Sequence, residues 1–173
     1  MVWTDGNRNG KWNESDQNVH INGILYRDYR GMVLSSVGQD TTTSGTSETD
    51  LGTVVVPANI LGSTGSLSAR AFGWFEGGAG IQTFKLYFDT GSTTIFSAIA
   101  AGSWKFEATL RNLAYNSQVI VWKFYVDGSP GLVYTGWYNV SVGTNADRTL
   151  KITGQCPTDP DKIHIVDWRV AED

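Results

Sequence analysis

Short stretches in which apolar and polar residues alternate follow one another through the chain after residue 50. In residues 104–110, for example, Trp104 and Phe106 alternate with Lys105 and Glu107. A period of two is typical of a β-strand with one buried face, and Gly, Asn, Asp and Ser between the stretches favour turns. The pattern predicts strands at residues 51–56, 67–75, 84–88, 93–99, 104–110, 118–126, 133–142, 149–153 and 163–170.

The spacing of these strands predicts the fold class. No long helical connection separates them, so the strands should pair antiparallel. We expect an all-β protein: an antiparallel, jelly-roll-like β-sandwich of about eight strands with an extended N-terminal arm. Residues 118–126 are apolar almost throughout, with Lys123 as the interruption, which predicts a strand covered on both faces.

The first 50 residues differ from the rest. They are polar and Gly-rich, with isolated aromatic residues and no clear period. Residues 20–37 are richer in apolar side chains and favour one or two strands, because Gly23 and Gly31 argue against a helix. Residues 39–50 consist almost entirely of Thr, Ser, Gly and acidic residues, which is typical of a linker or long exposed loop. We therefore predict an arm and linker at 1–50 and a sandwich domain at 51–173.

Composition excludes several classes of protein. The 173 residues are 40% hydrophobic and 17% charged, with a formal net charge of −4 and no basic block, so nucleic acid is not an expected partner. No apolar run reaches the roughly 18 residues of a membrane span, and the N-terminus is too polar for a secretory signal. The single cysteine, Cys156, predicts a buried thiol, with an intermolecular crosslink or reactive thiol as the alternative.

The sequence contains no catalytic pattern. His20 and His164 have no second ligand at metal spacing, and no Gly-rich loop precedes a Lys-Ser or Lys-Thr pair. Glu76 and Glu107 lie on different predicted strands, where a glycosidase-like pair would have to face one cleft. We expect no enzyme activity, no cofactor and no metal, with calcium binding at acidic turns as a weaker alternative.

The aromatic residues fall into two groups. Those at inward positions of strong strands, such as Trp104 and Trp122, are expected in the core. The others have the opposite parity to the inward set of their strands and predict a second packed surface: Phe72, Trp74, Tyr87 and Trp137. That surface suits either a sugar-stacking platform or an oligomer interface, which is enriched in the same residues.

Several segments of the body resemble small jelly-roll proteins in the virions of tailed bacteriophages. These segments are Leu51-Gly52-Thr53, residues 57–62, Gly65-Ser66-Leu67, residues 85–88 and residues 102–108. The resemblance covers roughly residues 50–170 and extends to capsid decoration (cement) proteins, head fibres and tail-fibre modules. It implies a homotrimer on the virion surface, made in the host bacterial cytoplasm, with the major capsid protein or another virion protein as its partner.

Two functional hypotheses follow. In the first, the chain is a capsid decoration protein whose arm binds the capsid through aromatic and basic anchors: Trp3, Trp12, Tyr26, Arg27, Tyr29 and Arg30. The initial Met, the short chain and the absence of a fibrous repeat favour this hypothesis. In the second, it is a receptor- or glycan-binding module of a tail fibre or spike, with the outward aromatic residues as its contact surface.

Overall fold

The computed structural model describes thirteen strands. Its described residues are 18–21, 24–27, 33–37, 41–44, 46–77, 80–127, 132–156 and 161–173, and within 18–44 only the backbone and the burial of Leu34 are described. The strands are β1 (Asn18–Ile21), β2 (Ile24–Arg27), β3 (Val33–Val37), β4 (Thr41–Ser44), β5 (Thr49–Val56), β6 (Ser66–Glu76), β7 (Gln82–Phe88), β8 (Gly91–Ala98), β9 (Gly102–Ala114), β10 (Ser117–Val126), β11 (Leu132–Val140), β12 (Arg148–Gln155) and β13 (Lys162–Glu172).

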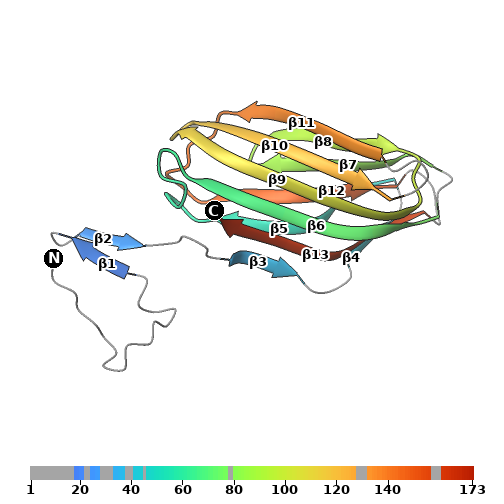
Figure 1. The fold of residues 1–173 in the computed structure, drawn as a ribbon, viewed down its shortest axis with the longest axis horizontal. Coiled ribbons are helices and arrows are strands. Elements are labelled where there is room, and N and C mark those ends of the chain that lie inside the picture. The colour runs from blue at the N-terminus through green and yellow to red at the C-terminus, as the bar shows by residue number, and fades with distance from the viewer. Residues whose placement is uncertain are drawn as a thin grey trace, which may run out of the picture.

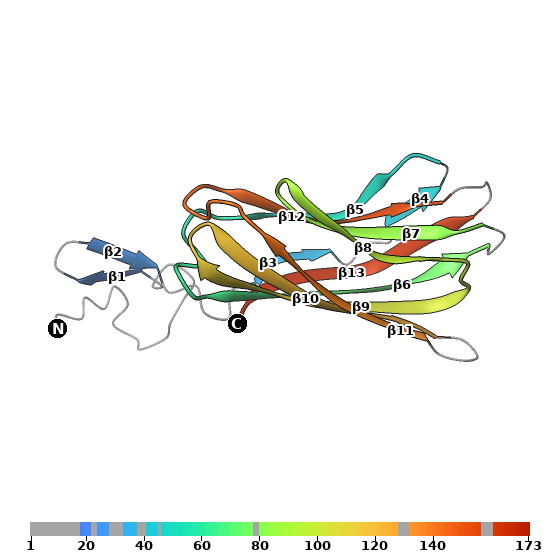
Figure 2. The same cartoon turned by 90° about the horizontal axis from the view of Figure 1, so that it is seen from above.

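Strands β5–β13 form two antiparallel sheets packed face to face, and no helix occurs in the described ranges (Figure 1). The large sheet has the order β11-β10-β9-β6-β13, with β3 and β4 added beyond β13, and the small sheet has the order β5-β12-β7-β8. Figure 2 shows the two sheets as separate layers. The predicted all-β antiparallel sandwich is confirmed.

Aromatic rings fill the space between the sheets. The ring of Phe84 on β7 lies 4.8 Å from Trp104 on β9 and 5.0 Å from Phe124 on β10, measured between centroids. Phe96 on β8 stacks on Phe124 at 4.9 Å and lies 6.2 Å from Phe84. All four side chains are buried, as are the other inward residues of these strands. Large rings in offset and edge contacts contribute strongly to a core of this size.

The alternating pattern of the long strands explains their orientation. Along β6, Leu67, Ala69, Ala71 and Phe75 are buried, and the residues between them are exposed or partly exposed. Gly73 occupies the remaining inward position. A glycine is required there because a Cβ would overlap the backbone carbonyl of His164 on β13. The burial of Cys156 agrees with the predicted buried thiol.

Part of the predicted linker is strand. Residues 41–44 form β4, which pairs with residues 162–165 of β13, and β5 already begins at Thr49. Residues 33–37 form β3, which pairs with the other half of β13. The compositional argument for a linker was wrong at β4 because the open edge of β13 supplies hydrogen-bond partners that no local sequence pattern reveals. The domain boundary at residue 50 stays a prediction.

The expectation that β10 is covered on both faces was also wrong. Its residues alternate between buried and exposed positions, and the side chain of Val121 is 50% exposed. An apolar residue on an outer face does not require burial, so the apolar run misled the prediction.

Strands β1 and β2 form a two-stranded antiparallel sheet of their own, in which Val19 pairs with Tyr26 and Asn18 with Arg27. Figure 1 shows this hairpin beyond the end of the sandwich. Within the described ranges, no helix is long and apolar enough to cross a membrane.

Candidate functional site

The outer face of the large sheet carries many of the exposed apolar side chains of the protein. We call it the broad face and define it by the outward positions of β13, β6, β9, β10 and β11. Its apolar residues are Phe72, Trp74, Leu113, Val121, Val133 and Trp137. Exposed apolar side chains gathered on one face mark a candidate interaction site.

Trp74 is held at one side of the broad face by its neighbour on β13. His164 is its cross-strand partner, and the imidazole stacks on the indole with centroids 4.3 Å apart and planes 11° apart. His164 is buried, but Trp74 stays 38% exposed. One face of the indole is therefore covered by the imidazole, and the ring is fixed with part of its surface open to a ligand.

Glu76, two residues after Trp74 on β6, holds His164 and Lys162 in place through two contacts. Its Oε2 lies 2.8 Å from Nε2 of His164, and its Oε1 accepts a hydrogen bond from Nζ of Lys162 at 2.9 Å. The Lys162 ammonium, and then His164, lower the pKa of the Glu76 carboxyl. The carboxylate is thus ionised at neutral pH and positions the imidazole that supports Trp74.

A second aromatic site lies at the opposite edge of the broad face. Trp137 on β11 is 67% exposed, and its cross-strand partner on β10 is Val121. Because β11 is the edge strand of the large sheet, Trp137 is open on the side away from β10.

A row of charged residues lies between the two aromatic sites. In register across the sheet, Arg169 of β13 is opposite Arg70 of β6, Arg70 is opposite Glu107 of β9, and Glu107 is opposite Lys123 of β10. The Lys105 ammonium lies 2.8 Å from the Glu107 carboxylate and is the main cause of the lowered pKa of Glu107. Arg70 and Lys123 lower this pKa further. The row is thus a basic strip with one shared carboxylate.

The four aromatic residues predicted as a surface do not lie together. Phe72, Trp74 and Trp137 share the broad face, whereas Tyr87 is on β7, in the small sheet on the other side of the molecule. Parity within a strand shows which residues face away from the core, but not to which sheet the strand belongs.

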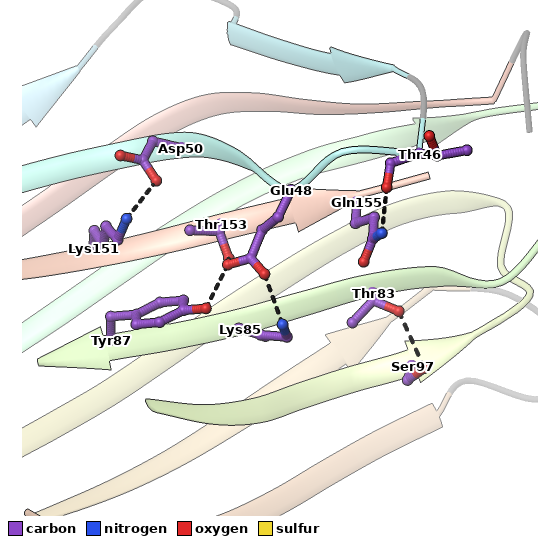
Figure 3. Close-up of polar contacts among 10 residues, drawn as sticks. All are labelled: Thr46, Glu48, Asp50, Thr83, Lys85, Tyr87, Ser97, Lys151, Thr153 and Gln155. Carbon is purple, nitrogen blue, oxygen red and sulfur yellow. Dashed lines mark hydrogen bonds and ion pairs between the residues drawn. The ribbon is translucent and has the colours of Figure 1, made fainter. Parts of the chain in front are cut away.

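Tyr87 is part of a polar network on the outer face of the small sheet, centred on Glu48 (Figure 3). The Glu48 carboxylate accepts hydrogen bonds from Lys85 Nζ and the Tyr87 hydroxyl, both at 2.6 Å, and from the Thr153 hydroxyl at 2.8 Å. Burial opposes ionisation of Glu48, but these donors outweigh it and lower its pKa to about 2. The network attaches the segment before β5 to strands β7 and β12.

The structure separates the two carboxylates that might have formed a glycosidase pair. Glu107 on β9 is the cross-strand partner of Arg70 on β6. Arg70 lies six residues before Glu76 on the same strand, so Glu107 and Glu76 are about 20 Å apart. Glycosidases hold their two carboxylates within about 10 Å. In the described part of the chain, no cluster of His, Cys, Asp or Glu is suited to a metal ion.

The predicted arm anchors fall in the part of the chain whose side chains the structure does not describe. Trp3, Trp12, Tyr29 and Arg30 lie outside the described residues, and Tyr26 and Arg27 are described only by their backbone pairing in β2. Sequence reasoning missed Arg70, Lys123, His164 and Arg169 as site residues. The outward parity of Arg70 and Lys123 was visible, but His164 and Arg169 share a face only because β13 has an irregularity between Ile165 and Asp167. The pairing of β13 with β6 and of β9 with β10 then brings all four next to the aromatic residues.

Comparisons with known proteins give structural similarities only. No family model matches the chain, and no curated protein sequence matches it. Among solved structures, the chain is similar to the CBM2 module of the evolved Dit of Lactobacillus casei BL23 phage J-1, with 9% identity and a TM-score of 0.41, covering 82% of this chain and 95% of that one. It is also similar to peanut lectin with a nine-residue peptide, with 11% identity and a TM-score of 0.38, covering 84% and 90%.

Proposed function

We propose that this protein is a non-catalytic module that binds a glycan on its broad face. The observation that carries the proposal is the arrangement at Trp74, where His164 fixes an indole that remains 38% exposed. A pyranose ring presents a flat patch of C–H groups that stacks on an aromatic face, and a ring that is already fixed loses little rotamer entropy on binding.

The distribution of polar groups supports a sugar ligand over a protein interface. The two aromatic sites are separated by Arg70, Glu107 and Lys123, so the apolar side chains do not form one continuous patch. The cores of protein interfaces are depleted in charged residues. A glycan, in contrast, needs apolar ring contacts and hydrogen-bonding groups side by side.

Glycan binding by three single variants tests the proposal. A glycan array identifies bound sugars, and calorimetry then measures their affinity for the wild type, Trp74→Ala, Trp137→Ala and the control Tyr115→Ala. Tyr115 is 54% exposed but lies in the turn between β9 and β10. We expect each Trp variant to lose about tenfold in affinity or more, corresponding to about 1.4 kcal/mol, and the control to be unchanged. If the folded wild type binds no glycan on the array, the proposal is contradicted.

A second candidate function is attachment to a bacteriophage particle through the N-terminal segment. The observation that favours it is the separate β1–β2 sheet. A two-stranded sheet alone is marginally stable in water, so a surface on another protein would stabilise it. In this proposal, the partner is the major capsid protein or another virion protein, the chain is a homotrimer, and Trp3, Trp12, Tyr26, Arg27, Tyr29 and Arg30 make the contacts.

Removal of residues 1–30, which include all six proposed contact residues, tests this second function. The shortened chain keeps β3 and β4 on the edge of β13, so its sandwich should still fold. We expect electron microscopy to show the full chain on particles and the shortened chain absent from them, and sedimentation to report a trimer. Full occupancy by the shortened chain would overturn the role of the arm.

A further inference from the structure

The broad face concentrates positive charge in an acidic protein. Six Lys or Arg residues occupy its outward strand positions against three carboxylates, Glu76, Glu107 and Asp167, although the whole chain has a formal net charge of −4. These six, of 13 in the chain, are Arg70, Lys105, Arg111, Lys123, Lys162 and Arg169.

Few of these cations are neutralised by the protein itself. Lys162 is paired with Glu76, and Lys105 with Glu107. Within the described residues, Arg70, Lys123 and Arg169 make no ion pair, and Glu107, the carboxylate next to them in register, is already bound by Lys105. All three side chains are exposed.

The register aligns these charges across the sheet. Arg169, Arg70 and Lys123 lie in one row at right angles to the strands, with Glu107 between Arg70 and Lys123. Neighbouring strands are about 4.8 Å apart, so the row spans about 14 Å from β13 to β10. Arg70 directly opposite Arg169 is a like-charge pair, which costs stability in a free sheet. Binding of an anion would relieve that repulsion.

We propose that the ligand of the broad face is an acidic polysaccharide, whose carboxylate or phosphate groups bind the row of Arg169, Arg70 and Lys123 while its sugar rings stack on the aromatic residues at either side. This inference rests on the proposed glycan-binding function and names its ligand class. Guanidinium groups bind carboxylates and phosphates through paired N–H donors, which makes two adjacent arginines well suited to them.

Long nucleic acids fit this face less well. Single-stranded nucleic acid binds to continuous basic grooves with aromatic platforms, and duplex DNA needs many phosphate contacts. Here the row is short, contains Glu107 and belongs to a protein of net negative charge.

The test compares polygalacturonate with its methyl ester, which has the same sugar backbone without the charge, and with a hexose-phosphate polysaccharide and duplex DNA. Binding by the full chain is measured in about 0.05 M and about 0.5 M NaCl. The variants are Arg70→Gln, Arg169→Gln and the control Lys151→Gln, which removes one positive charge from the small sheet, where Lys151 pairs with Asp50.

We expect at least one acidic polymer to bind, the methyl ester to bind at least tenfold more weakly, and high salt to weaken the interaction. Arg70→Gln and Arg169→Gln should each reduce affinity for the acidic polymer several-fold, and Lys151→Gln should not. Comparison of polygalacturonate with the hexose-phosphate polysaccharide shows whether carboxylate or phosphate is preferred.

Other outcomes separate this inference from the function on which it rests. Salt-independent binding of neutral glycans that Trp74→Ala abolishes would overturn the acidic ligand and leave the glycan-binding function intact. Equal binding of duplex DNA would overturn the choice of a polysaccharide. If folded protein binds neither acidic nor neutral glycans, the proposed function itself fails.

Discussion

Arg70 and Arg169 are direct cross-strand neighbours on the broad face, one on β6 and the other on β13. Two like charges opposite each other repel, so the pair lowers the stability of the free protein. Substitution of Arg169 by Gln should therefore raise the free energy of unfolding slightly, by up to about 0.5 kcal/mol, while it weakens binding of acidic glycans. Urea unfolding at low and high salt measures the effect.

Salt provides the control for this prediction. Added NaCl screens the repulsion in the wild type and should reduce the difference between the two proteins. A variant that is clearly less stable than the wild type at low salt would show that Arg169 has a structural role instead.

Glu48 should make the free energy of unfolding depend on pH in the acidic range. Its pKa is lowered to about 2 in the folded protein, below the ordinary value of 4.5, so its ionised form stabilises the fold. This contribution is complete above about pH 5 and is lost as the pH falls from there towards 2. Glu48→Gln, which keeps the shape of the side chain, should cost about 1–2 kcal/mol at pH 7.

The pH profile of the variant distinguishes this mechanism from simple loss of packing. Denaturant unfolding of wild type and Glu48→Gln should give curves that converge between pH 5 and pH 2. A difference in stability that stays constant over this range would show that the charge of Glu48 is not what stabilises its network with Lys85 and Tyr87.

Gln118 should contribute strongly to stability because its buried amide connects β10 with β9 and with the segment after β11. It donates to Asn112 Oδ1 at 2.8 Å and to the carbonyl of Val142 at 3.0 Å, and it accepts a hydrogen bond from the Val142 N–H at 3.2 Å. Gln118→Ala leaves these buried groups without partners and should cost about 2–4 kcal/mol by thermal or urea unfolding. The exposed Asn139 gives a matched control: Asn139→Ala should change stability by less than about 0.5 kcal/mol.

Cys156 should be unreactive in the folded protein. Burial, with a further contribution from Asp161, raises the pKa of its thiol to about 11, so the thiolate that reacts with disulfide reagents is scarce at pH 8. A colorimetric thiol reagent should label the native protein slowly and the urea-unfolded protein at once. Rapid labelling of native protein would show that Cys156 is accessible.

The sandwich could be predicted because each of its long strands is marked by an alternating pattern within the strand itself. The alternation in β6 and β9 identified the buried residues correctly, including Leu67, Phe75, Trp104 and Phe106. It failed where neighbours far along the chain decide the structure. Strand β4 has no apolar pattern and is a strand because β13 offers it a free edge.

The candidate site was predictable only in part for the same reason. The parity of Phe72, Trp74 and Trp137 indicated that they face away from the core, and the structure places them on one face. The support of Trp74 by His164, 90 residues later in the chain, depends on strand pairing, as does the separation of Tyr87 from the other three. Neither relationship has a signature in a single sequence.

An NMR titration tests the central claim most directly, since each tryptophan gives its own indole N–H signal. The protein is titrated with the glycan that binds most strongly on the array. Glycan binding on the broad face predicts that the signals of Trp74 and Trp137 shift, while those of the buried Trp104, Trp122 and Trp168 stay in place. Saturable binding that leaves the Trp74 and Trp137 signals unmoved would contradict it.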